Sequence, residues 1–154
     1  MKTFHFPLEP LRVLRKQKER EAQQRYARSL SACDAAAAQL QKATTDLTSG
    51  RDLLTRELNS GVSAAKMMNL RTWCMALEIH QHERRAAFTE ARRISQLAFQ
   101  EMVSARRDRE GLDCFHDKAR RAHALETFRA EQKNLDELAV LAGGSSLQSG
   151  ISQF

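Results

Sequence analysis

The sequence is poor in the residues that interrupt a helix. It contains only 2 prolines, Pro7 and Pro10, and 6 glycines among 154 residues. Because no proline follows residue 10, a helix that begins there meets no residue that lacks a backbone N–H. This absence argues against a fold of many short elements joined by turns.

Aromatic residues are also scarce, at 6% of the chain, and no stretch approaches the ~18 apolar residues needed to span a membrane. The three cysteines, Cys33, Cys74 and Cys114, are odd in number and widely spaced, which indicates free thiols in a reducing compartment. The N-terminus lacks the apolar core of a signal peptide. We therefore expect a cytoplasmic protein.

Helix-forming residues dominate what is present, chiefly Ala, Leu, Arg, Glu and Gln. Charged residues make up 29% of the chain, and arginines alternate with glutamates as on a solvated helix face. Hydrophobic residues make up 42%, but many of them are alanine, so a thick core is excluded. A thin seam between two helices needs no more than this.

Turn signals divide the chain once in its interior. Asn59-Ser60-Gly61-Val62-Ser63 supplies a glycine for positive φ and a serine to cap the next helix. Gly143-Gly144 marks the end of that helix, and the tail after it is expected to be disordered. The predicted fold is all-α, a long two-helix antiparallel coiled coil in one domain (1–142), with helices 10–58 and 64–142, a turn at 59–63 and a tail at 143–154.

A heptad seam supports this prediction in both helices. In the first helix, eight of ten seam positions are apolar: Tyr26, Leu30, Cys33, Ala37, Leu40, Thr44, Leu47, Arg51, Leu54 and Leu58. In the second, twelve of sixteen are apolar: Leu70, Trp73, Leu77, His80, Arg84, Ala87, Ala91, Ile94, Ala98, Glu101, Ala105, Asp108, Leu112, Phe115, Ala119 and Ala122.

The short turn makes the helices antiparallel neighbours, and folding about Gly61 places Leu30 by Ala91 and Arg51 by Leu70. The second helix then overhangs the first beyond about Leu112. After a small phase shift the stripe continues through Leu125, Phe128, Leu135 and Ala139. Apolar residues on an unpaired helix indicate a surface for a partner, here including Phe115, Leu125, Phe128, Leu135 and Leu138.

No catalytic or metal constellation emerges, and no cofactor is expected. Cys114 and His116 form a C-x-H, and Cys74 precedes His80, but Cys74 and His80 do not share a helix face and no second ligand pair faces them. The chain has no glycine-rich phosphate loop. An enzyme is not expected.

The basic balance, a net charge of +6 and a pI of about 9.7, leaves two other partners to consider. The run Arg12 to Arg20 suits nucleic acid by charge, but it lacks the Asn and small residues that read base edges. An amphipathic helix on a membrane is opposed by the seam, which already uses the apolar face. We expect neither nucleic acid nor a direct membrane contact.

Three motifs, in order along nearly the whole chain, resemble the flagellar FliJ family. Phe4-His-Phe6-Pro-Leu8-Glu-Pro-Leu11 is similar to its F-x-F-x-L-x-x-L opening. Gly61-Val-Ser, followed by Asn69, Leu70, Trp73 and Leu77, resembles its turn and second helix, and Lys133-Asn-Leu-Asp-Glu137 its K-x-x-D-E ending.

The resemblance implies a non-enzymatic stalk and chaperone of the flagellar type III export apparatus. Its implied partners are the hexameric export ATPase, the cytoplasmic domain of the export gate and export chaperones. It implies a cytoplasmic protein, peripherally associated with the inner-membrane export apparatus, that promotes assembly of the ATPase ring. The end with both termini then faces the ATPase, through Leu11, Leu14, Arg15, Lys18, Leu125, Phe128, Leu135, Asp136 and Glu137.

The resemblance also implies a gate-binding stripe just after the turn: Trp73, Leu77, His80 and Arg84. These four residues also fall on the predicted seam, so seam packing and partner binding both stay open. Three alternatives to the flagellar stalk are kept: the stalk of a virulence type III secretion system, a basic coiled-coil nucleic-acid binder, and a coiled coil whose overhang pairs with its own copy.

Overall fold

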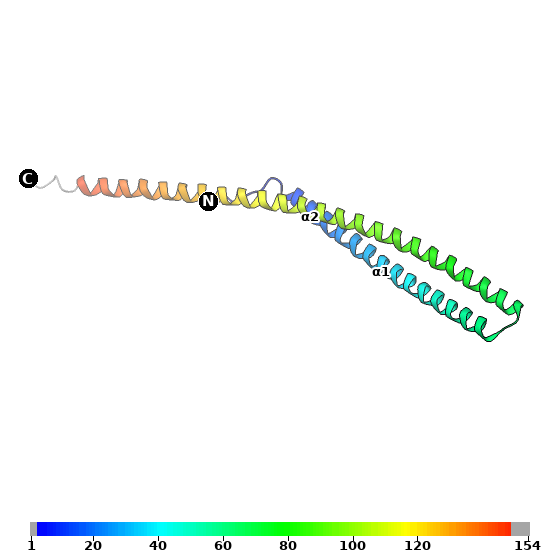
Figure 1. Ribbon diagram of the computed structural model, residues 1–154. Coiled ribbons are helices and arrows are strands. Elements are labelled where there is room, and N and C mark those ends of the chain that lie inside the picture. Colours follow the sequence, from blue (N-terminus) through cyan, green and yellow to red (C-terminus); the bar gives the residue numbers. More distant parts are fainter. Residues whose placement is uncertain (1–2, 149–154) are drawn as a thin grey trace, which may run out of the picture. The chain divides into compact units, whose positions relative to one another are not determined.

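The computed structural model describes residues 3–148, with side chains described as far as Leu141. It contains two helices, α1 (Glu9–Ser60) and α2 (Ala64–Gln148), joined by a turn at residues 61–63, and no strand occurs among these residues (Figure 1). The helices pack against each other, and α2 has 85 residues against 52 in α1. The prediction of an all-α antiparallel hairpin with a longer second helix is confirmed.

The helix ends follow the local signals. Pro10 lies in the first turn of α1, where its missing N–H is not needed. In the turn, Gly61 adopts φ of 76°, a left-handed conformation that suits glycine. Ser63 then caps α2, because its Oγ accepts a hydrogen bond from the backbone N–H of Lys66 at 3.4 Å.

The predicted end of the second helix is wrong. The sequence predicts a stop at residue 142, but α2 continues through Gly143 and Gly144 to Gln148. A glycine in a helix costs roughly 1 kcal/mol relative to alanine, which weakens the helix without blocking its hydrogen bonds. Residues 149–154 of the predicted tail lie outside the described residues.

The chain forms two compact units. Unit 1 comprises Met1–Lys16 and Arg107–Phe154, and unit 2 comprises Gln17–Arg106. Each unit contains part of both helices and is described by itself. The single domain over residues 1–142 therefore stays a prediction.

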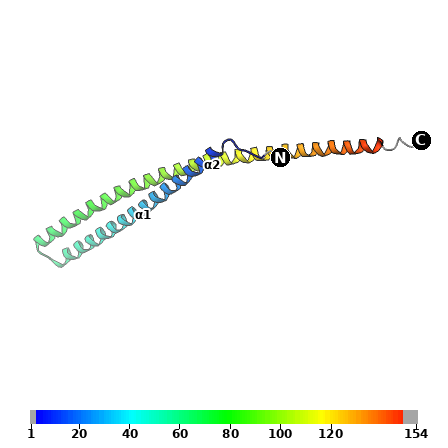
Figure 2. The same cartoon turned by 180° about the vertical axis from the view of Figure 1, so that it is seen from behind.

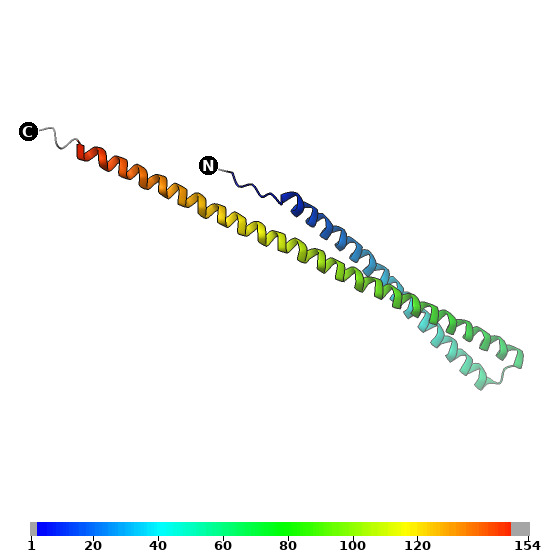
Figure 3. The ribbon, with the colours of Figure 1, turned by 90° about the horizontal axis from the view of Figure 1, so that it is seen from above.

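Unit 2 is held by a thin seam of small side chains. In Figure 2 its α1 and α2 segments run side by side from the turn, and in Figure 3 they cross within the unit. Its buried residues are few, and most of them are small: Glu19, Ala22, Ala43, Leu47, Gly50, Cys74 and Ser95. Small residues allow the two backbones to approach closely. A Cβ added to Gly50 would meet Leu77 Cδ1 at 2.8 Å and the Trp73 ring at 3.2 Å.

Half of the predicted seam is displaced by one residue. Leu70, Leu77, Arg84 and Ala91 lie at the interface as expected, but the alternate layers contain Cys74, Gln81, Phe88 and Ser95. Trp73 and Ile94 lie on a flank and are half exposed, as is Leu30 on α1, where Ser29 replaces it in the seam. The apolar pattern favours Trp73 and Ile94, but Cys74 and Ser95 are the buried residues beside them, because closely packed helices have room only for small side chains at these two layers.

The register is also displaced. The sequence predicts Arg51 beside Leu70, whereas Arg51 Nη2 lies 2.7 Å from Glu78 Oε1. Tyr26 contacts Phe99, with 5.4 Å between the ring centroids, and Arg84 donates to Gln39 Oε1 at 2.9 Å. The shorter turn, three residues instead of five, moves the fold point beyond Gly61 and shifts these pairs along α2.

Candidate functional site

In unit 1 the N-terminal segment packs against α2 through aromatic rings. Phe6 is only 5% exposed, with its ring centroid 5.0 Å from that of His116 and 6.1 Å from that of Phe115. Phe4 lies 5.7 Å from His116 and 5.5 Å from His123. We call these five residues the N-terminal clasp. Edge-on ring contacts of this kind add to the apolar area that the rings bury.

The predicted start of the overhang is wrong, because the N-terminal clasp pairs with α2 beyond it. The sequence places the end of pairing near Leu112, with Phe115 unpartnered. Instead, residues 4–6 extend the paired part of α2 as far as His123, and Phe115 contacts Phe6. The extended residues before Pro7 reach farther along α2 than the same number of helical residues, since a strand-like chain rises ~3.3 Å per residue against 1.5 Å.

An ion-pair network joins the first turns of α1 to α2 beside the clasp. Arg12 Nε donates to Asp113 Oδ1 at 2.7 Å, and Arg109 Nη1 donates to Asp113 Oδ2 at 2.6 Å. Arg12 also pairs with Glu9 at 3.3 Å. The hydrogen bond from Arg12, followed by that from Arg109, lowers the pKa of Asp113 below its usual value, although partial burial acts in the opposite direction.

This lowered pKa predicts a pH-dependent contribution to stability. The Asp113 carboxylate stabilises the fold above its unfolded-state pKa, and the contribution is lost as the pH falls through the lower folded-state value. Asp113→Asn should therefore lower Tm by about 2 °C at pH 7. As the pH falls through the lowered folded-state pKa of Asp113, the wild-type carboxylate becomes protonated as well, and the difference should shrink. Thermal melts followed by circular dichroism measure the difference in Tm between the two proteins at each pH. Asp34→Asn, at an exposed site of α1, is the control.

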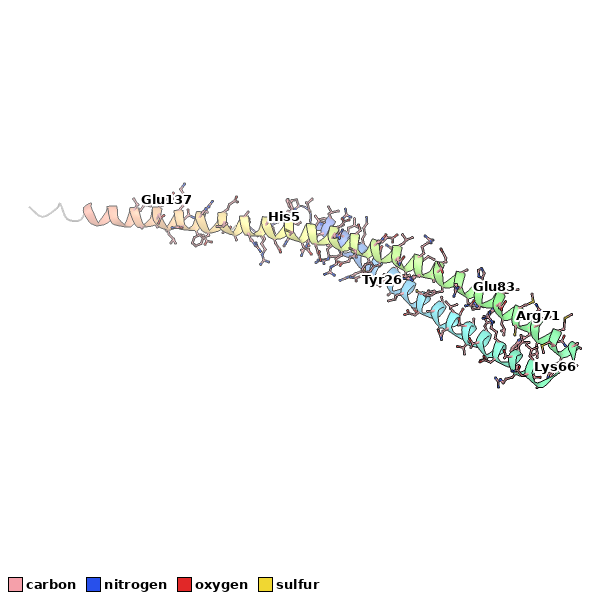
Figure 4. All side chains as sticks on the ribbon, in the orientation of Figure 1. His5, Tyr26, Lys66, Arg71, Glu83 and Glu137 are labelled. Carbon is pink, nitrogen blue, oxygen red and sulfur yellow. The ribbon has the colours of Figure 1, made fainter. Side chains whose placement is uncertain are left out.

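A second apolar stripe lies farther along α2, at heptad spacing. We call Leu125, Phe128, Gln132, Leu135 and Ala139 the C-terminal stripe. Its large side chains are strongly exposed, Leu125 at 55%, Phe128 at 63% and Leu135 at 66%. In Figures 1 and 2 no other described segment of unit 1 lies beside this part of α2, in which Figure 4 labels Glu137.

The C-terminal stripe does not continue the seam. His116 and Leu125 are nine residues apart, or two and a half helical turns, so they project from opposite sides of α2. Phe128 is likewise turned well away from His123, five residues before it. The predicted small phase shift is therefore wrong, because the change of face is nearly half a turn. The stripe does not hold the N-terminal segment against α2, because the clasp does so on the other face of the helix.

The structure separates the residues predicted to face the ATPase. Leu11, Leu14 and Arg15 lie at the level of Asp108 to Asp113, where Arg15 Nη1 contacts Asp108 Oδ2 at 2.6 Å. Lys18 falls in unit 2 and is exposed. The other five are exposed on the unpaired part of α2: Leu125, Phe128, Leu135, Asp136 and Glu137.

The four residues predicted to face the gate also divide. Leu77 is half-buried over Gly50, and Arg84 is half-buried and bonded to Gln39. Trp73 touches Gly50 with one edge of its ring but is 45% exposed, and His80 is exposed two turns farther on the same flank. Of these four residues, only Trp73 and His80 are thus exposed.

Sequence reasoning missed the residues that hold the end of unit 1 together. From the sequence alone, Asp113 is interpreted as a charge exposed to solvent, and His116 and His123 each lie one position after a residue of the predicted seam. The F-x-F spacing was the available signal, because in an extended segment Phe4 and Phe6 project to the same side.

Other kinds of site find no support in the described part of the chain. Among residues 3–148 no three His, Cys, Asp or Glu side chains group closely enough to hold a metal ion. Neither helix there contains a window apolar enough to cross a bilayer. A shallow groove lined by Tyr26, Ser95 and Phe99 lies in unit 2, where Figure 4 labels Tyr26.

The fold and its surfaces define a coiled-coil hairpin whose exposed apolar residues suit contacts with other proteins. The family model of the flagellar FliJ protein matches residues 4–147, so the chain belongs to the flagellar FliJ family. Comparison with curated proteins gave no match, and comparison with solved structures gave none either. The family acts as a non-catalytic component of flagellar protein export.

Proposed function

We propose that this chain is the stalk and chaperone of the flagellar type III export apparatus. It binds the hexameric export ATPase through the unpaired part of α2, promotes assembly of the ring and couples it to the cytoplasmic domain of the export gate. It hydrolyses nothing itself. It works in the cytoplasm and reaches the inner-membrane apparatus through its partners, with export chaperones as further partners.

The C-terminal stripe carries the ATPase proposal. The family match includes this segment, and its apolar side chains face solvent on the side of α2 away from the clasp. A ring can therefore bind the stripe without displacing Phe4 and Phe6 from α2. Asp136 and Glu137 add acidic groups at the far end of the stripe, where they select basic side chains on the ring.

For the gate we propose a smaller surface, built from Trp73 and His80. Trp73 is the only tryptophan of the chain, and a half-exposed indole is a frequent anchor in protein interfaces. Leu77 and Arg84 support this surface from the seam side, because they hold α2 against Gly50 and Gln39.

Copurification of the tagged chain with the export ATPase and with the cytoplasmic domain of the gate tests both contacts. We expect both proteins to be retained at low and moderate salt, because apolar contacts are only weakly screened. Trp73→Ala with His80→Ala should weaken gate binding roughly 10-fold and leave ATPase binding unchanged.

Two outcomes of this experiment would contradict the proposal. Retention of neither protein, with retention of the corresponding virulence-system partners instead, would assign the chain to that system. Binding of nucleic acid alone, falling steeply between low and moderate salt, would identify a basic coiled-coil nucleic-acid binder.

A further inference from the structure

The stalk proposal uses Asp136 but not the pattern that it forms with the other charges beside the C-terminal stripe. Arg129 and Asp136 flank the stripe on one side, seven residues apart, and Glu131 flanks it on the other. All three side chains are exposed. In a two-helix coiled coil, residues at such flanking positions meet their counterparts on the other helix and set its orientation.

These charges favour one arrangement of two copies over the other. In a parallel pair, Glu131 of one helix would meet Asp136 of the other, and the two carboxylates would repel. In an antiparallel pair, Arg129 meets Asp136 of the second copy, and symmetry repeats this attraction at the other end. We infer that the free protein forms an antiparallel dimer through the C-terminal stripes of two copies.

The apolar layers fit the same arrangement. When Arg129 lies opposite Asp136, Phe128 packs against Ala139 of the second copy, and Gln132 packs against Leu135. A large residue therefore meets a small one at both outer layers. The stripe covers Leu125 to Ala139, which is about 20 Å of helix at 1.5 Å per residue. An interface of this size lies at the small end of specific interfaces, so the dimer dissociates in the micromolar range.

The dimer has a consequence for binding that is independent of which protein the stalk engages. It covers Phe128 and Leu135, so any partner of the C-terminal stripe must compete with the second copy. Apolar residues that would otherwise face solvent are thereby covered until a tighter partner arrives. The clasp lies on the opposite face of α2 and is undisturbed.

Sedimentation velocity of the purified chain alone, from about 1 to 300 µM, tests this inference, since that range brackets a micromolar Kd. We expect a monomer at the lowest concentration and a dimer at the highest. Arg129→Asp and Asp136→Arg should each weaken dimerisation at least ~10-fold, because like charges then face each other twice. The double variant restores the attraction in reverse and should return to within ~3-fold of the wild type.

Glu131→Arg distinguishes the two orientations. It should change the Kd of an antiparallel dimer little, whereas it would tighten a parallel one by removing the repulsion from Asp136. The inference would be overturned if the wild-type chain stayed monomeric at every concentration. It would also be overturned if Arg129→Asp and Asp136→Arg each left the Kd of the dimer unchanged, or if Glu131→Arg tightened the dimer. Circular dichroism of every variant confirms that the helix is retained.

Discussion

Replacing Phe128 and Leu135 together by aspartate should abolish detectable binding to the hexameric export ATPase, weakening it roughly 100-fold or more. Both side chains are more than 60% exposed and lie on the same face of α2. The change therefore removes the apolar contact and places two carboxylates in a desolvated interface. Since nothing described in unit 1 packs against these side chains, the circular dichroism spectrum should remain helical.

The matched control replaces Met68 and Ile79 by aspartate. These residues are also strongly exposed on α2, at 69% and 61%, but they lie near the turn in unit 2. The control removes as much apolar surface and adds the same charge, so it should bind the ATPase like the wild type. Full binding by the Phe128 and Leu135 variant, or an equal loss of binding in the control, would contradict the placement of the ATPase-binding site on the unpaired part of α2.

Ala43→Leu should destabilise the hairpin by about 2 kcal/mol, lowering Tm by about 6 °C. Ala43 is 2% exposed, and it lies at the level of His80 and Arg84 on α2. Added methylene groups have no space there, so the helices must separate locally and neighbouring layers lose contact. Thermal melts followed by circular dichroism measure the effect.

Ala38→Leu provides the control, because Ala38 lies on the same helix and is exposed. Leucine and alanine have similar helix propensities, so this variant should melt within about 1 °C of the wild type. Equal Tm values for both leucine variants would mean that the seam does not pass through residue 43.

The sequence was sufficient to predict the fold because helix-breaking residues are nearly absent outside one turn. Gly61 and Ser63 have the roles that their residue types suggest, positive φ and helix capping. The phase of the seam was harder to predict. A heptad count can step by three or by four from Leu70, and the step of three reached Trp73, the larger apolar residue. The structure takes the step of four to Cys74, because close backbones at Gly50 exclude an indole from the layer.

The candidate site was predictable in composition but not in arrangement. Leu125, Phe128 and Leu135 could be recognised as exposed because no partner helix reaches them. That they face away from the clasp depends on the phase of the true seam, which runs through His116 and His123. The Arg12–Asp113 contact joins residues 101 positions apart, and no local pattern of charges identifies such a pair.

The most direct test of the stalk proposal is a titration of the purified chain into the export ATPase, with ATP turnover and ring formation recorded together. A stalk that assembles the ring should raise both, with saturation near one chain per hexamer, and the Phe128 and Leu135 variant should raise neither. Turnover and assembly that stay at the level of the ATPase alone, at every concentration of the chain, would contradict it.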